Sequence, residues 1–371
     1  MAWGMLGHQW AVNLLRSHIA SESVRHAYLF IGPDSVGKRT LALRFAQALN
    51  CEAPPSPGDY CGECRACIKI PEGKYPDLHV VKVGQLDEVI RDEHVPNGVE
   101  VRGEQTYGGA GGSQTARQVS SMVKVKQIRL LQRQLALAPY EGRWRVALLP
   151  RFWEASESAA NALLKTLEEP APQVVMLLTA RSAESLLPTI VSRCEVIPLR
   201  ALARSELEKG LVSIGEADER ARLLAGLSAG RPGLALKLME DPERMEEREA
   251  LLEDLFSLLE KNRAERFNYA VNYRPTRNES TQEVRARAVK TLETWLSLWR
   301  DIMINTLGAE ASVQNDDRRT DIERITSSVS TEQVVDAVRS TERTLRTLHQ
   351  YANVQLAMEN HLLDLPTIIP G

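Results

Sequence analysis

Five short apolar runs, each the length of a buried strand, alternate with amphipathic segments over the first 200 residues. This alternation predicts an α/β fold in which helices cover a parallel sheet, because parallel strands are joined by crossover connections. The predicted strands are "AYLFI" (27–31), "LHVVKV" (78–83), "WRVALL" (144–149), "VVMLLTA" (174–180) and "CEVIPL" (194–199).

The pattern changes after about residue 200, where strand-like runs give way to helical periodicity. A length of 371 residues suggests two or three domains. We expect three: an α/β domain over 1–200, a small helical domain over 201–241, and an all-helical domain over 242–371. Residues 85–121 contain "YGGAGG" and little apolar periodicity. They are predicted to form a flexible insertion.

Charge and hydropathy limit the class of protein. The formal net charge is −3, so global electrostatics do not by themselves argue for nucleic-acid binding. The sequence has no run of about 18 uncharged apolar residues that would indicate a membrane span. The opening "MAWGMLGHQW" lacks the charged start and apolar core of a secretory signal. We therefore expect a cytoplasmic protein.

A phosphate-loop pattern follows the first predicted strand. Gly32, Gly37 and Lys38 in "GPDSVGKRT" have the spacing G-x-x-x-x-G-K. The N–H groups of such a turn attract anions at the helix start, and Lys38 would add charge toward the terminal phosphates. Arg39, however, occupies the position of the magnesium-binding hydroxyl, and Thr40 is rotated by about 100° around the helix. We expect a degenerate phosphate loop in which nucleotide binding is doubtful and magnesium is not held, or a glycine turn that matches by chance.

The second half of an ATPase site is also altered. A later strand in such enzymes ends in an acidic pair that positions magnesium and the attacking water. The candidate strand here ends in Pro150 and Arg151, before a helix for which Ser156 is the expected N-cap. Proline offers no ligand, and arginine brings positive charge where a carboxylate is needed. The sequence therefore predicts no intrinsic ATP hydrolysis.

Four of the five cysteines, Cys51, Cys61, Cys64 and Cys67, form a C-x9-C-x2-C-x2-C pattern. In a reducing compartment this clustering favours metal binding over disulfides. Four thiolates satisfy a tetrahedral zinc ion with no open position, which is typical of a structural site. An iron–sulfur cluster is the runner-up, although the "IKIP" that follows lacks the next cysteine of ferredoxins. Free buried thiols are the third alternative.

Two longer stretches, "NALLKTLEEP" (161–170) and "LLPTIVSRC" (186–194), resemble the clamp-loader branch of the AAA+ ATPases. The resemblance extends through "RHAYLF", "QIRLLQRQLALAPYEGRWRV", "SAGRPGLAL" and "ANVQLAMENHLLDLP", and covers the chain apart from residues 85–121. It implies an AAA+ P-loop module with an inserted zinc module after the phosphate-loop helix, then a small helical lid and a helical collar that serves oligomerisation.

The resemblance also implies a role for Arg193. In the family, the Ser-Arg-Cys triplet supplies an arginine finger to the ATP site of a neighbouring subunit. A guanidinium suits this task because it is planar, always charged and able to grip phosphate oxygens by two bonds. The triplet alone would indicate only a surface arginine beside a buried thiol, Cys194. Thr179 falls at the position of the family's sensor residue on the fourth strand.

The implied function is that of a hydrolysis-incompetent member of a hetero-pentamer. Its partners would be clamp-loader subunits of the gamma/tau and delta types, and the complex would load a ring-shaped sliding clamp onto primed DNA. Arg39 and the pair Pro150-Arg151 depart from the ATPase subunits of the family. An active ATPase subunit is the alternative, and a free-standing zinc- or DNA-binding adaptor is a third possibility.

Overall fold

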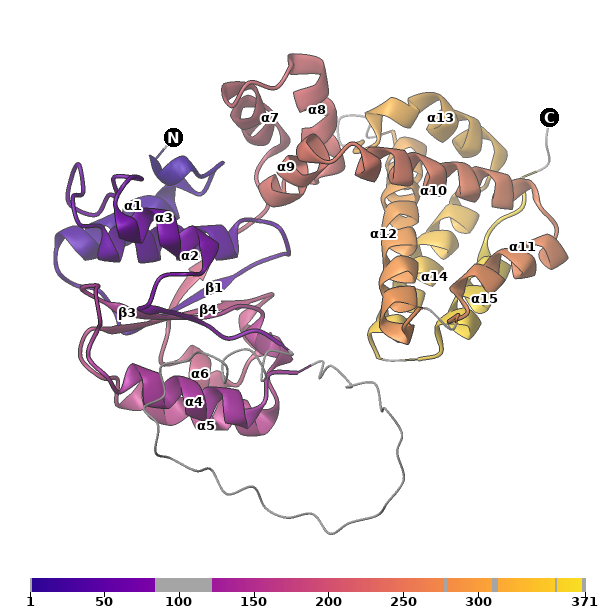
Figure 1. The fold of residues 1–371 in the computed structure, drawn as a ribbon. Coiled ribbons are helices and arrows are strands. Elements are labelled where there is room, and N and C mark those ends of the chain that lie inside the picture. The colour runs from indigo at the N-terminus through magenta and orange to yellow at the C-terminus, as the bar shows by residue number, and fades with distance from the viewer. Residues whose placement is uncertain (1, 84–121, 277–278, 309–312, 351, 369–371) are drawn as a thin grey trace, which may run out of the picture. The chain divides into compact units, whose positions relative to one another are not determined.

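The computed structural model describes residues 2–83, 122–276, 279–308, 313–350 and 352–368. The chain forms two compact units, Met1–Ala201 and Leu202–Gly371 (Figure 1). The insertion predicted over 85–121 lies outside the described residues, and the division of the second unit into a lid and a collar stays a prediction. Every helix in the described part of the chain is too short or too polar to span a bilayer.

A five-stranded, wholly parallel sheet forms the centre of the first unit, in the order β2-β3-β4-β1-β5. The strands are β1 (Ala27–Ile31), β2 (Leu78–Val80), β3 (Arg145–Leu149), β4 (Val174–Ala180) and β5 (Glu195–Pro198). The predicted parallel sheet is confirmed, since each apolar run contains one strand. The edge strand β2 is shorter than "LHVVKV". After it, the Val81 N–H still donates to the Leu148 carbonyl at 3.0 Å, and the Lys82 carbonyl accepts from the Gln127 side chain at 2.8 Å.

Side chains of the strands alternate between two core clusters. Tyr28 and Phe30 pack with α1 (Gln9–Ala20), α2 (Lys38–Asn50) and α3 (Arg65–Glu72) on one face. Leu29 and its neighbours pack with helices on the other face, namely α4 (Val125–Leu135), α5 (Glu157–Glu168) and α6 (Pro188–Val191). Figure 1 shows the resulting three layers. The alternation follows from the two-residue period of a strand.

The helix α5 begins as the sequence predicts. The Ser156 hydroxyl accepts a hydrogen bond from the backbone N–H of Ala159 at 3.2 Å, which caps the first turn. Leu163 and Leu167 are buried against the sheet, whereas Leu164 is only partly buried. The burial of Leu163 and Leu167 thus fixes the rotation of α5 and with it the position of its C-terminal residue.

In the second unit, the described residues form helices and no strands. The main helices are α7 (Arg204–Ser213), α8 (Asp218–Leu227), α9 (Pro232–Glu240), α10 (Glu243–Glu260), α11 (Arg263–Ala270), α12 (Thr281–Thr306), α13 (Arg319–Ser328), α14 (Thr331–His349) and α15 (Val354–Asp364). Trp295 and Trp299 of α12 are fully buried in the core of α10–α15. Arg204 of α7 donates to the Val313 carbonyl at 2.8 Å and pairs with Asp316, which joins the shorter helices to the larger bundle.

One buried carboxylate organises the approach to β3. Asp77 accepts hydrogen bonds from the backbone N–H groups of Tyr140, Glu141 and Gly142 at 2.7–2.8 Å, and the Arg145 guanidinium lies 3.3 Å away. Burial raises the pKa of Asp77, but the three N–H donors and Arg145 outweigh it and hold the pKa below its usual value. The ionised form of Asp77 therefore stabilises the fold.

We expect Asp77→Asn to destabilise the first unit by about 2–4 kcal/mol, because the amide turns N–H groups toward backbone donors and leaves the buried Arg145 without its carboxylate partner. Denaturant unfolding at neutral pH measures this. Since the folded pKa is depressed, the wild-type contribution is present above the unfolded carboxyl pKa and is lost as pH falls through the folded pKa. Equal stabilities of the two proteins at neutral pH would contradict the assignment, and the exposed Glu72→Gln is the control.

Candidate functional site

Two glycines shape the turn between β1 and α2. Gly32 has φ of +143°, and a Cβ added there would come within 2.0 Å of the Leu199 carbonyl oxygen. Gly37 has φ of +102° and precedes the first residue of α2. Side chains are excluded at the first position and strained at the second. The strand–turn–helix context expected of a phosphate loop is present.

Lys38 lies inside this turn. Its ammonium group donates to the carbonyl of Gly32 and, at 2.6 Å, to that of Pro33, and it lies 3.9 Å from the Asp34 carboxylate. The side chain is buried, with 8% of its surface exposed. Burial lowers the pKa of Lys38, and the Asp34 charge opposes this. The cation is at the loop, but its hydrogen bonds are made within the chain.

The metal-binding positions carry no suitable ligand. Arg39 and Thr40 are both exposed at the first turn of α2. After β3 and Pro150, Arg151 adopts a left-handed conformation with φ of 54°, and its backbone N–H donates to the Thr179 hydroxyl at 2.9 Å. Thr179, for which the resemblance implies a sensor position, thus has a backbone partner within the chain.

Positive charge gathers at the carboxyl ends of β3 and β4. Arg151 pairs with Glu154, and its guanidinium lies 5.5 Å from the centroid of the Trp153 ring. Arg181, directly after β4, lies 5.3 Å from the same ring and forms an ion pair with Asp34 at 3.0 Å. Both carboxylates here are therefore already paired with arginines.

Sequence reasoning missed Asp34, Trp153 and Arg181. Asp34 falls at a variable position of the phosphate-loop pattern, so the pattern gives it no role. Arg181 directly follows a predicted strand, and this position could have placed it at the same edge as the phosphate loop. Trp153 carried no signal of its own.

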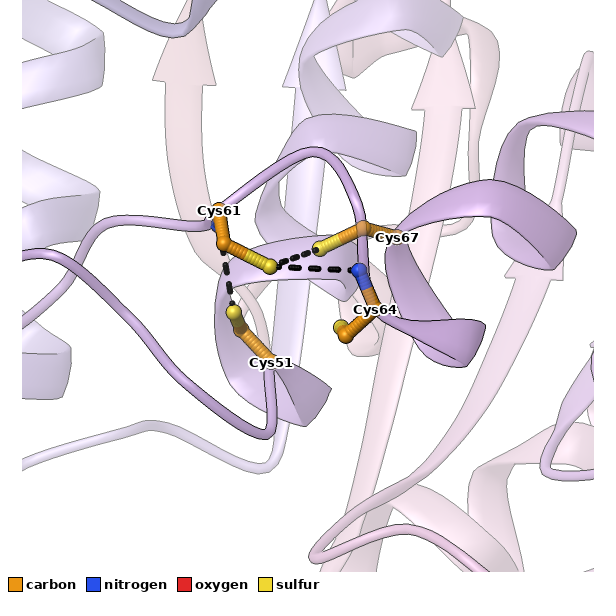
Figure 2. Close-up of side chains that lie close together, drawn as sticks. All are labelled: Cys51, Cys61, Cys64 and Cys67. Atoms are coloured by element: carbon orange, nitrogen blue, oxygen red, sulfur yellow. Dashed lines mark hydrogen bonds between the residues drawn. The ribbon is translucent and has the colours of Figure 1, made fainter.

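The four clustered cysteines converge as the sequence predicts. Figure 2 shows their side chains side by side, and all four sulfur atoms lie within 4.8 Å of one another. The Cys61 and Cys67 sulfurs are 3.9 Å apart. Thiolates at about 2.3 Å from one tetrahedral zinc ion lie about 3.8 Å apart. The cluster could therefore hold a single metal ion after small adjustments.

Local hydrogen bonds and burial act in opposite directions on the thiols of this cluster. The backbone N–H of Cys61 donates to the Cys51 sulfur at 3.2 Å, and that of Cys64 to the Cys61 sulfur at 3.3 Å. The N–H groups around Cys61 lower its pKa to about 6, whereas burial raises the pKa of Cys51 and of Cys67. The Gln47 amide donates to the Cys67 carbonyl at 2.6 Å and joins the module to α2.

Cys194 lies apart from this cluster. It packs on the other face of the sheet, against the core that α4, α5 and α6 share, and burial raises its pKa to about 12. It is therefore a core thiol and not a fifth ligand, as the sequence indicates.

Arg193 follows α6 and is about one-third exposed. Its Nη2 donates to the Glu168 carboxylate at 2.7 Å, and its Nη1 donates to the Thr189 carbonyl at 2.9 Å. The guanidinium is thus at the surface, where it could serve a neighbouring chain, but it is bound within its own chain. Glu168 was missed by sequence reasoning because its partner lies 25 residues away.

Comparisons with known proteins match most of the chain. Residues 7–203 match the family described as DNA polymerase III, delta subunit, and residues 242–367 match the family described as DNA polymerase III, delta subunit, C terminal. The DNA polymerase III subunit delta' of Bacillus subtilis is 26% identical over 95% of this chain and 94% of its own length.

Two further relatives match shorter parts. The DNA polymerase III subunit delta' of Pseudomonas aeruginosa is 33% identical over 63% of this chain and 61% of its own length. The DNA polymerase III subunit tau/gamma of Haemophilus influenzae is 30% identical over 57% of this chain, and the match spans a quarter of that relative.

Proposed function

Since the chain belongs to the DNA polymerase III delta subunit family, we propose that it is the delta-prime subunit of a bacterial clamp loader. The observation that carries this proposal is the similarity to a delta' subunit along 95% of the chain. In this function the subunit helps to load the sliding clamp onto primed DNA in the cytoplasm. Its partners are gamma/tau and delta subunits in a hetero-pentamer.

The geometry at the phosphate loop supports a subunit that does not hydrolyse ATP. Magnesium lacks a hydroxyl ligand at Arg39 and an acidic pair after β3. The arginines that stand at this edge, Arg151 and Arg181, would repel a divalent cation, and the neighbouring carboxylates are already paired. The loop therefore keeps its turn without the groups that activate water.

We expect the purified chain to show no magnesium-dependent ATP turnover above background, because both the metal ligands and the water-positioning carboxylate are missing. A coupled assay of ADP release measures this, with Lys38→Ala as the matched control. Turnover that requires magnesium and disappears in Lys38→Ala would instead establish an active subunit of the gamma/tau type. That alternative is favoured by the glycine and lysine spacing and by the similarity to a tau/gamma subunit.

The cysteine cluster is proposed to hold one structural zinc ion. Support comes from four sulfurs within 4.8 Å, which suits one tetrahedral ion better than a cluster that places several iron atoms between its ligands. Bound zinc would keep the thiols deprotonated and fix the loop between α2 and α3. All four positions are used by the protein, so zinc would take no part in a reaction.

Arg193 is proposed to act as an arginine finger in trans. It is supported by its surface position at the end of α6 and by a guanidinium that already binds oxygen atoms through both terminal nitrogens. In the complex these nitrogens would bind phosphate oxygens of ATP held by a neighbouring subunit. The chain would then contribute to hydrolysis without performing it.

A further inference from the structure

The hydrogen bond between Arg193 and Glu168 is incompatible with Arg193 acting as an arginine finger. A finger stabilises negative charge with its terminal nitrogens, yet Nη2 of Arg193 is bound to Glu168 at 2.7 Å and Nη1 to the Thr189 carbonyl at 2.9 Å. A carboxylate that stays on the guanidinium also cancels part of its charge and repels the phosphates that approach it. Glu168 must therefore release Arg193 before the finger can act.

The stability of α5 does not explain why a glutamate occupies position 168. It is the last residue of α5, at the end where the partial charge of the helix is negative and a carboxylate is unfavourable. Its side chain is about half exposed, so no buried cation requires a carboxylate at this position. The hydrogen bond to Arg193 is the interaction that the structure gives this side chain.

We propose that Glu168 is a positioning residue that holds Arg193 against its own subunit until a neighbouring ATP site closes around the guanidinium. This inference rests on the proposed finger role of Arg193. The two residues come from separate elements, the end of α5 and the turn after α6, so a small shift between these elements separates them. The partly exposed ion pair is weak enough to open whenever the interface offers a better anion.

The test compares Glu168→Gln with Glu169→Gln in the reconstituted complex of this chain, its gamma/tau and delta partners, the clamp and primed DNA. Glu169 is the matched control because it is adjacent, exposed and of the same charge, and the structure gives its side chain no ion pair within the described residues. Without clamp and DNA, Glu168→Gln is expected to raise the rate of ATP hydrolysis about two- to five-fold, the range of a partly exposed ion pair. With saturating clamp and DNA, which bring the finger into place in both proteins, the rates are expected to be equal.

Two further measurements separate this role from a structural one. The KM for ATP should not change, because Glu168 acts on the finger and not on ATP binding. The double variant Glu168→Gln/Arg193→Ala should behave like Arg193→Ala alone, with no rise in the unstimulated rate. A rise that persists without Arg193, a loss of the stimulated rate in Glu168→Gln, or identical rates for Glu168→Gln and Glu169→Gln would each overturn the inference. Full stimulated rates in Arg193→Ala would instead refute the finger role of Arg193, on which this inference rests.

Discussion

Arg193→Ala is expected to slow the clamp- and DNA-stimulated ATP hydrolysis of the assembled complex, although we propose that this subunit itself hydrolyses no ATP. The expected loss arises at the one site that receives this guanidinium, because a finger stabilises charge that develops on the transferred phosphoryl group. In GTPases a finger contributes about 10³–10⁵ in rate, or roughly 4–7 kcal/mol of barrier. The loss for the whole complex is expected to be smaller, since other sites keep their own fingers.

Single-turnover hydrolysis and clamp-loading assays measure this effect. Arg200→Ala is the matched control, because Arg200 is an exposed arginine of the same unit. Both variants should assemble normally and keep their metal. Undiminished hydrolysis and loading by the Arg193→Ala complex would show that Arg193 is an ordinary surface arginine.

Cys64→Ser is expected to abolish zinc binding and to unfold the segment between α2 and the end of α3. One zinc ion per chain should copurify with the wild type. In small zinc modules the apparent binding free energy is about 10 kcal/mol or more. Here zinc would order the loop between α2 and α3, and α3 also packs Ala66 and Ile70 on the core. The sheet should persist, because its two core clusters are formed mainly by strands and by α1, α2 and α4–α6.

Elemental analysis and hydrogen exchange over residues 51–70 check this prediction. Cys194→Ser is the control, because this substitution removes a thiol that lies outside the cluster. Iron with sulfide, or no metal in protein purified under reducing conditions, would contradict the zinc assignment. Unchanged exchange in Cys64→Ser would show that the metal does not order the loop.

The parallel sheet and the cysteine cluster could be predicted because both depend on local patterns. The apolar run at 174–180 matches the strand β4 in full, since a central strand buries both faces and each residue there is apolar or paired. The four cysteines lie within 17 residues of sequence, and the two-residue gaps by themselves bring thiols together. The predicted runs for β2, β3 and β5 are each longer than the strand, and the difference is largest for the edge strand β2, which ends at Val80.

The ion pairs at the site could not be predicted from such patterns. Arg181 and Asp34 are 147 residues apart, and they meet because β4 and β1 are neighbours in the sheet. Glu168 and Arg193 meet because α5 and α6 pack on the same face. A sequence pattern shows which charges exist, whereas the strand order and helix packing decide which of them become partners.

The most direct test of the proposed function is copurification of this chain with gamma/tau and delta subunits from the same organism, followed by native mass spectrometry. A stable hetero-pentamer that contains one copy of this chain, and that loads the clamp onto primed DNA only when this chain is present, is the predicted result. Elution of the chain apart from those subunits, with full loading activity in its absence, would contradict it.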